Sequence, residues 1–376
     1  MPNPYDPQTP AKPEHFGGRH KVLASIKERI EFAITHKKSG AALVYGHRGV
    51  GKTSLLKKII DEAKGIETKP ANILYFYRRL GRTTNDEELY RLLNEELIAA
   101  INNRKSFIER LQSIGNKIAK VDLKVIELDT VSEAQQKSYY QIWKSHINKL
   151  HNIDYILVAI DDADFLSVEA IGELKCIVED SGSTPILLIV SGGIQFESRL
   201  VDDYSPVARI FSGASFNIGK LDYDETKEVL EKPLTAEQTK WDVEAMKEIH
   251  KLTGGYPYLI QCLAKASYVE NHTITKDNVS QHINDAIEIG KNWLIHEIPR
   301  ASDQDVLSFV KIAQLEKNIF QSVDMAKAGI QAVYIGRLVK LGIIKKISRG
   351  RYELQKSPII AEFEKLKRGL GRFKQV

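Results

Sequence analysis

Apolar residues in this chain form two kinds of pattern, short continuous runs and longer stretches with helical spacing. The continuous runs predict strands at 41–46, 72–77, 155–164, 185–193 and 215–221. Helical spacing lies between several of them, at 20–37, 52–64 and 169–180. Buried strands that alternate with helices are typical of a parallel sheet covered on both faces. The pattern therefore predicts an α/β fold for the first part of the chain.

After Leu221 only helical spacing continues. It predicts four helices, with Asp222 and Thr275 as N-caps of two of them, at 222–234, 242–255, 256–271 and 275–290. From about Pro299 the pattern changes again, to three helices and a hairpin around Arg349 and Gly350, at 302–314, 322–329, 331–342 and 343–355. Three helices followed by a hairpin indicate a winged helix-turn-helix.

These patterns divide the chain into four segments. A chain of 376 residues is too long for one compact core. We expect an extended proline-rich arm at 1–14, the α/β domain at 15–221, a helical domain at 222–298 and the winged helix at 299–376.

The stretch 86–150 carries the least information. It is predicted to be mostly helical, with a short strand at 122–128. Its Tyr and Trp residues are expected in the core, and His146 and His151 at the surface. No function follows from it.

Composition limits the class of protein. No apolar run approaches the length that a membrane span needs, and the chain does not begin with a basic-then-apolar signal pattern. Cys176 and Cys262 lie far apart and form no metal-binding motif. We expect a cytoplasmic protein with no membrane partner and two reduced thiols.

The charge is unevenly distributed. Residues 335–376 contain twelve Lys and Arg and three Asp and Glu, a net +9, whereas the whole chain carries +5, so the remainder sums to −4. This asymmetry points to a polyanionic partner for the C-terminal part. The alternative is a basic surface that is only solvated.

The clearest chemical motif is Gly46-x-x-x-x-Gly51-Lys52-Thr53, between a predicted strand and a predicted helix. In such a phosphate loop, backbone N–H groups and the helix N-terminus surround a phosphate chain. We expect Lys52 to reach the β- and γ-phosphates and Thr53 to bind Mg²⁺ of a bound Mg²⁺–ATP. The nucleotide-binding residues expected from the loop are Gly46, His47, Arg48, Gly49, Val50, Gly51, Lys52, Thr53 and Ser54.

Acidic residues follow the buried strand at 155–164. Asp161 is expected at the carboxyl edge of the sheet, where it would hold the Mg²⁺, and Asp162 is the candidate that orients and activates the attacking water. Because most fast ATPases of this architecture have Glu at the second place, the shorter Asp predicts slow or partner-dependent turnover. Ser191, at the end of the next strand, would contact the γ-phosphate or the water, or would simply end the strand.

Two arginines come shortly before the last strand of the α/β domain. Arg209 is expected to point outward and to act as an arginine finger in the site of a neighbouring subunit. Arg199 is the lesser candidate. Either could instead form a surface salt bridge.

A family resemblance rests on four segments in this order and spacing: "GHRGVGKTS", "ILVAIDDAD", "SPVARIF" and "TGGYPYLIQ". In them the chain resembles the AAA+/STAND class of P-loop ATPases and, more distantly, the origin-recognition-type initiators. The closest resemblance is to archaeal and bacterial ATPases with a C-terminal winged helix. It covers nearly the whole chain, and it implies that Phe16, in the segment up to Arg19, lies against the adenine.

The second helical segment departs from the initiator pattern. Initiators carry an arginine in the lid helix that contacts the γ-phosphate. Here Gly255-Tyr256-Pro257 is similar to the Gly-x-Pro of STAND switch ATPases. The resemblance implies that Tyr256 and Pro257 contact the nucleotide and favours a nucleotide-gated switch.

The predicted winged helix supplies the candidate nucleic-acid contacts. The helix at 331–342 would enter a major groove through Arg337, and the hairpin would contact phosphates through Lys345, Lys346, Arg349 and Arg351. Winged helices in multidomain ATPases also serve as packing or protein-binding modules.

The leading hypothesis is a slow ATPase switch that forms homo-oligomers with ATP and acts on duplex DNA. Alternatives are a DNA-bound AAA+ regulator of replication or transposition, and a STAND-type sensor whose basic end binds a protein or RNA. A small-molecule kinase is disfavoured, because no pocket for an acceptor substrate is visible in the sequence.

Overall fold

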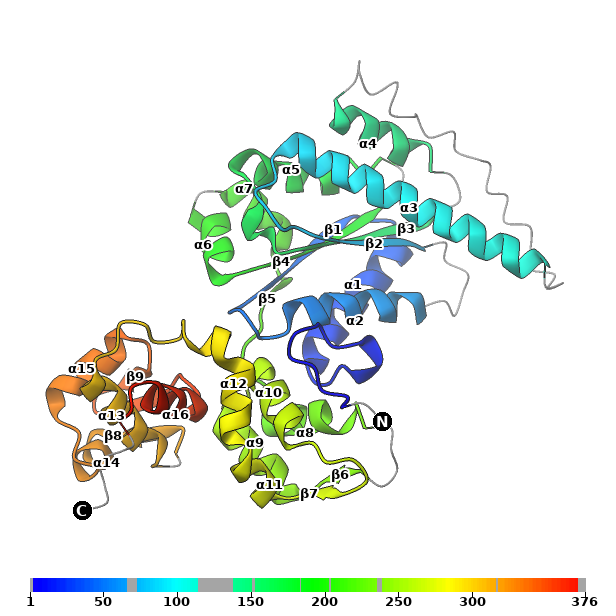
Figure 1. The fold of residues 1–376 in the computed structure, drawn as a ribbon. Coiled ribbons are helices and arrows are strands. Elements are labelled where there is room, and N and C mark those ends of the chain that lie inside the picture. Colours follow the sequence, from blue (N-terminus) through cyan, green and yellow to red (C-terminus); the bar gives the residue numbers. More distant parts are fainter. Residues whose placement is uncertain are drawn as a thin grey trace. The chain divides into compact units, whose positions relative to one another are not determined.

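The computed structural model describes residues 3–65, 73–113, 138–150, 153–182, 184–202, 204–234, 239–315 and 317–370. The chain forms two compact units. We name Arg19–Gly219 the sheet unit, and Met1–Gly18 together with Lys220–Val376 the helical unit. Figure 1 shows the elements of each.

In the described part of the sheet unit, five parallel strands form one sheet in the order β2-β3-β4-β1-β5. They are β1 Gly40–Tyr45, β2 Ile73–Arg79, β3 Tyr155–Asp161, β4 Ile186–Gly192 and β5 Ser215–Asn217. Every residue of β3 and β4 is buried, as their continuous apolar runs predict. Because β4 lies between β1 and β3, the ends of these three strands meet at one edge of the sheet.

Helices cover both faces of this sheet (Figure 1). One face carries α1 His20–His36 and α2 Lys52–Gly65; the other carries α3 Asp86–Ser113, α4 Tyr139–Asn148 and α5 Val168–Glu179. The chain then continues through α6 Ile194–Asp202 and α7 Ser205–Ala208. The main apolar core lies between the sheet and α3, α4 and α5.

Two expectations for the stretch 86–150 have different outcomes. The short strand predicted at 122–128 lies outside the described residues. His146 was expected at the surface but is fully buried, and its Nδ1 lies 2.9 Å from Oδ1 of Asn94. It faces the core because α4 packs directly against α3.

Directly after the sheet unit, the described residues of the helical unit form five helices. They are α8 Tyr223–Glu231, α9 Val243–Thr253, α10 Pro257–Ser267, α11 Lys276–Gln281 and α12 Ile283–Leu294. Asp222 and Thr275 cap α8 and α11 through capping boxes, as predicted. The fourth predicted helix is two helices, because the chain leaves the helical conformation at His282. Two short strands, β6 Lys240–Trp241 and β7 Thr273–Ile274, were not predicted.

The N-terminal arm packs into this unit. Apart from a 3₁₀ turn at Pro13–His15, it has no regular structure in the part that the structure describes. Tyr5 is almost completely buried, and its hydroxyl accepts a hydrogen bond of 2.7 Å from Nε1 of Trp241. Its ring contacts the rings of Trp241 and Tyr268 edge-on. One aromatic side chain thus anchors an otherwise polar arm.

The C-terminal part follows the order helix, strand, helix, helix, hairpin and helix. These elements are α13 Asp303–Ala313, β8 Ile319–Gln321, α14 Ser322–Lys327, α15 Ala332–Lys340, β9 Ile344–Ser348, β10 Arg351–Leu354 and α16 Pro358–Lys367. The three strands form an antiparallel sheet in the order β8-β10-β9. β8 and α16 were not predicted. One continuous apolar core includes residues from α8–α12 and from this part.

The fold class predicted from the sequence is confirmed: a parallel P-loop sheet, then a helical segment, then helices with a small antiparallel sheet. The boundaries proposed for separate domains stay predictions. Among the residues placed in the structure, none belongs to a helix with the length and apolarity of a membrane span.

Candidate active site

The phosphate loop connects β1 to α2. Gly46 has no room for a side chain, since a Cβ there would lie 2.2 Å from the carbonyl oxygen of Ile218. Gly51 has a φ of 92°, which side-chain-bearing residues rarely adopt. The first residue of α2 is Lys52, so the loop ends at a helix N-terminus. The loop is thereby shaped to present N–H donors to an anion.

The side chain of Lys52 reaches back from α2 to the loop. Its Nζ donates hydrogen bonds to the carbonyl oxygens of Gly46, at 2.9 Å, and His47, at 3.1 Å. Burial lowers the pKa of Lys52, and the carboxylates of Asp164, Asp162 and Asp161 oppose that shift. A partly desolvated ammonium interacts strongly with a bound phosphate, because little water screens it.

Asp161 is the centre of a hydroxyl cluster. Its Oδ2 accepts hydrogen bonds from Thr53 Oγ1 and from the hydroxyl of Tyr77, both at 2.7 Å. Its Oδ1 accepts a hydrogen bond from Ser191 Oγ. The side chain of Asp161 has no solvent exposure. Burial, followed by the charge of Asp161, raises the pKa of Tyr77, so the phenol stays protonated.

Thr53 and Asp161 fit a Mg²⁺ site. In the described ranges, the ion pairs include none to Asp161, so this buried carboxylate has hydroxyl partners and no cationic one. No cluster of three or more His, Cys, Asp or Glu side chains suited to a metal was found there. Mg²⁺ commonly uses one or two carboxylates together with substrate phosphates and water, which this donor set allows.

Asp162 is paired with an arginine that the sequence analysis did not single out. Nε of Arg79, the last residue of β2, lies 2.6 Å from Oδ2 of Asp162. Asp162 has a φ of 57°, so the chain turns sharply after β3. The N–H of Asp162 donates weakly to Ser191 Oγ, at 3.4 Å. Ser191 thus joins both acidic residues, and its contact with a phosphate stays a prediction.

The two candidate finger arginines differ in surroundings. Arg209 is exposed in the short 3₁₀ turn Arg209–Phe211. Arg199 is partly buried, and its Nη2 lies 3.4 Å from the carbonyl oxygen of Leu166. Exposure favours Arg209 for a role in a neighbouring subunit, which stays a prediction.

Three candidate nucleotide contacts belong to the helical unit. Phe16 is buried, and its carbonyl oxygen accepts a hydrogen bond of 3.0 Å from Nζ of Lys232. Tyr256 packs against Trp293, with 5.1 Å between ring centroids, and Pro257 is the first residue of α10. The part of these three residues in nucleotide binding stays a prediction.

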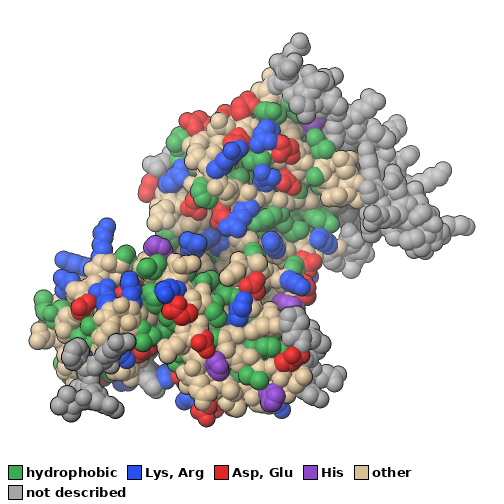
Figure 2. All heavy atoms as spheres, viewed as in Figure 1, with side chains coloured by type: hydrophobic (Ala, Val, Ile, Leu, Met, Phe, Trp, Pro, Cys, Tyr) green, Lys and Arg blue, Asp and Glu red, His purple; other side chains and the backbone are tan. Residues whose placement is uncertain are grey.

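The candidate nucleic-acid contacts separate into two kinds. On the hairpin of β9 and β10, Lys345, Lys346, Arg349 and Arg351 are all exposed; Figure 2 shows Lys and Arg side chains over this end of the helical unit. Arg337 of α15 instead donates from Nε and Nη2 to both carboxylate oxygens of Asp305, at 2.8 and 2.7 Å. This pair lowers the pKa of the buried Asp305 to about 2. Arg337 therefore has a structural role beside any DNA contact.

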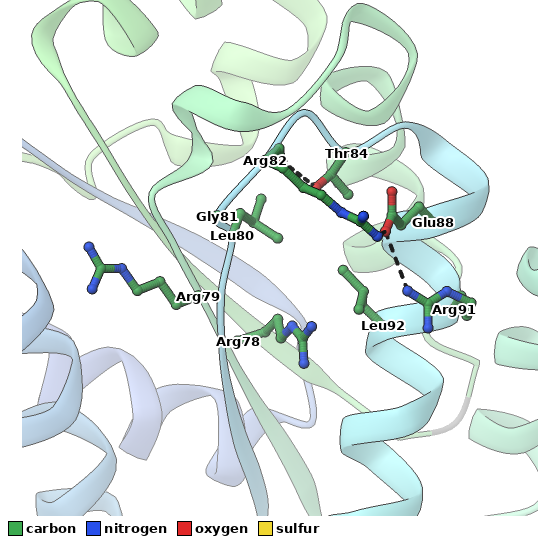
Figure 3. A pocket seen from close by; sticks show the side chains of 9 residues that line it. All are labelled: Arg78, Arg79, Leu80, Gly81, Arg82, Thr84, Glu88, Arg91 and Leu92. Atoms are coloured by element: carbon green, nitrogen blue, oxygen red, sulfur yellow. Dashed lines mark hydrogen bonds and ion pairs between the residues drawn. The ribbon is translucent and has the colours of Figure 1, made fainter.

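A pocket of about 340 Å³ lies at the carboxyl end of β2 (Figure 3). Arg82 and Arg91 both pair with Glu88 of α3, at 2.6 and 3.3 Å, and Arg78 pairs with Glu96, at 3.1 Å. Because carboxylates of α3 balance these arginines, the cluster ties the β2–α3 loop to the helix. Arg79 points away from this cluster (Figure 3), as alternation along a strand requires.

Comparison with known proteins agrees with this geometry. Residues 15–189 match the family model described as an AAA ATPase domain. The structure of the Aeropyrum pernix ORC2 protein in ADPNP–ADP complexes is similar, with 14% identity, a TM-score of 0.56, and coverage of 93% of this chain and 94% of that chain. Its ADP form gives 14% identity, a TM-score of 0.52 and 94% coverage of each chain. A search of curated protein sequences gave no match. At these identities the likeness shows the fold alone.

Proposed function

We propose that the protein binds and slowly hydrolyses Mg²⁺–ATP as a molecular switch, and the match of residues 15–189 to the AAA ATPase domain model supports this proposal. The observation that supports this most is the cluster at the sheet edge, where Thr53 and Tyr77 both donate to Asp161 at 2.7 Å. It lies beside a phosphate loop whose lysine is partly desolvated.

In this proposal each residue has one task. The loop N–H groups and Lys52 bind the phosphates and stabilise negative charge on them as the bond to the γ-phosphate breaks. Asp162 orients the attacking water and accepts its proton. Bound Mg²⁺ would be held by Thr53 and Asp161 and would neutralise charge on the phosphates.

Slow turnover is expected because Asp162 is already engaged. Its Oδ2 lies 2.6 Å from Nε of Arg79, so this oxygen must share or give up that hydrogen bond before it can accept one from the attacking water. Arg209, exposed on the sheet unit, would complete the site of a neighbouring copy in an ATP-dependent homo-oligomer.

We further propose duplex DNA as the partner of the C-terminal part. The support is the hairpin on which Lys345, Lys346, Arg349 and Arg351 are exposed together. Such residues would contact phosphates rather than base edges. Binding would then depend steeply on salt, with a log–log slope of about −4 to −5 if four to six phosphates are neutralised.

A second candidate is a protein partner for the same end. Val333 of α15 and Ile347 of the hairpin are 63% and 47% exposed, and Arg337 is engaged by Asp305. An apolar helix face without a free arginine is less suited to reading bases than to contacting a protein.

One experiment separates these functions. The ATPase rate and the particle mass of the full chain would be measured with and without duplex DNA, at low and moderate salt. The DNA proposal expects stimulation or a larger assembly at low salt that is lost at moderate salt. No ATPase activity under any condition would contradict the switch, and ATPase activity indifferent to DNA would favour the protein partner.

A further inference from the structure

Among the described residues, the Asp161 carboxylate accepts side-chain hydrogen bonds from Thr53 at the phosphate loop, from Ser191 of β4 and from Tyr77 of β2. Tyr77 lies in β2, next to β3, and its hydroxyl is 2.7 Å from Oδ2 of Asp161. Its ring lies beside α2, with Nζ of Lys57 6.0 Å from the ring centroid. The Tyr77 side chain therefore lies between α2 and the carboxylate of Asp161 at the end of β3.

The hydrogen bonds of Asp161 divide unequally between its two oxygens. Oδ2 accepts from Thr53 and Tyr77, whereas Oδ1 accepts from Ser191. A carboxylate offers about four acceptor positions. These three hydrogen bonds therefore leave a position on Asp161 for a metal ion or for a water bound to it. Thr53 can bind a metal through its oxygen and still donate its proton, so both donors to Oδ2 are compatible with a loaded site.

We propose that Tyr77 is a positioning residue for Mg²⁺: its hydroxyl holds the Asp161 carboxylate in the orientation in which Asp161 and Thr53 bind the metal. This deepens the proposed function and rests on it. Partners that orient a ligating carboxylate typically contribute about 10–100-fold to metal affinity. Tyr77 acts through Asp161 and has no role in binding the phosphates.

Tyr77→Phe removes only the hydroxyl, and the ring that packs near Lys57 is kept. Tyr75→Phe is the matched control, because Tyr75 lies two residues earlier on the same side of β2. Its ring has Nζ of Lys64 at 5.3 Å from the centroid, and its hydroxyl has no hydrogen bond to Asp161 among the described contacts.

The test is a titration of the full chain with a non-hydrolysable ATP analogue at a series of Mg²⁺ concentrations, by calorimetry. Tyr77→Phe is expected to raise the half-saturating Mg²⁺ concentration about tenfold. Analogue affinity without Mg²⁺ should stay at the wild-type value, which also shows that the variant is folded. Tyr75→Phe should match the wild type in its half-saturating Mg²⁺ concentration and in its analogue affinity without Mg²⁺.

Two results would count against the proposal in different ways. A half-saturating Mg²⁺ concentration unchanged in Tyr77→Phe would overturn the role of Tyr77 and leave the proposed function intact. A wild-type protein that binds the analogue equally well with and without Mg²⁺, or not at all, would overturn the Mg²⁺–ATP site itself and the role of Tyr77 with it.

Discussion

Nε of Arg79 lies 2.6 Å from Oδ2 of Asp162, so the candidate base of the site is joined to a guanidinium from the neighbouring strand. The hydrogen bond to Asp162 raises the pKa of Arg79, so the guanidinium stays protonated. Since the Arg79 side chain is 60% exposed, solvent screens this pair and its strength is modest, about 0.2–1 kcal/mol.

Arg79→Ala should therefore raise the basal rate of ATP hydrolysis by at most about fivefold, because Oδ2 of Asp162 no longer has to give up the Arg79 hydrogen bond to accept one from the attacking water. ATP affinity should stay unchanged. Arg78→Ala is the matched control, since Arg78 pairs with Glu96 on the other side of the strand. The measurement is the steady-state ATPase rate of the wild type, Arg79→Ala and Arg78→Ala. A lower rate in Arg79→Ala would mean that Arg79 assists hydrolysis directly.

Arg209→Ala tests assembly. An arginine finger typically raises the rate of hydrolysis about 10³–10⁵-fold. The wild-type ATPase rate per subunit should therefore increase with protein concentration, as oligomers form. Arg209→Ala should lose this increase. Its affinity for ATP at low concentration should be unchanged. Arg199→Ala serves as the comparison. If only Arg199→Ala loses the gain, the finger is Arg199.

The local motifs could be predicted from the sequence. The phosphate loop is a contiguous segment between a strand and a helix, and Asp161 follows a run of buried residues that determines which edge of the sheet it reaches. Tyr77 and Arg79 were missed, because their roles depend on β2 pairing in register with β3, about eighty residues further along the chain. The "YRR" that ends this strand was the available signal.

Tertiary contacts also explain the other differences. The proline-rich arm was expected to be extended, and nothing in its sequence indicates that Tyr5 is buried against Trp241, more than two hundred residues away. The DNA contact expected of Arg337 stays a prediction, and the sequence analysis did not foresee that buried Asp305 of α13 binds its guanidinium through two hydrogen bonds. No local pattern at 331–342 reveals the position of that carboxylate.

The hairpin and Arg337 should behave differently in DNA binding. Alanine at Lys345, Lys346, Arg349 and Arg351 should abolish retention on duplex at moderate salt and reduce the log–log salt slope by about 3–4. Arg337→Met should change that slope by at most about 1, while it lowers the free energy of unfolding by about 1–3 kcal/mol. Filter binding at several salt concentrations measures the salt slope, and urea denaturation measures the free energy of unfolding. If the quadruple variant binds duplex DNA as the wild type does, the hairpin is not the DNA-binding site.

His250 should make the helical unit sensitive to acid. Its Nδ1 lies 2.9 Å from Thr226 Oγ1. Burial lowers the pKa of His250; the charge of Asp222 opposes that shift, and the charge of Lys220 adds to it. The folded state therefore favours the neutral ring, and the unfolded chain takes up a proton first as the pH falls through about 6.5. Stability should be fully present above that pH and should decrease below it.

This effect can be measured by urea denaturation at pH 7.5 and pH 5.5, followed by tryptophan fluorescence. The loss of stability between the two pH values should be smaller in His250→Asn than in the wild type. Equal losses would assign the acid sensitivity to other groups.

The central claim is that the sheet unit hydrolyses Mg²⁺–ATP with Lys52 binding the phosphates and Asp162 as the base. The direct test measures ATP binding and ATP hydrolysis in parallel for the wild type, Lys52→Ala and Asp162→Asn. We predict slow hydrolysis by the wild type and loss of nucleotide binding in Lys52→Ala. In Asp162→Asn, binding should be retained and hydrolysis should decrease by about 10²–10⁴. Unchanged affinity in Lys52→Ala, or wild-type turnover in Asp162→Asn, would contradict the account.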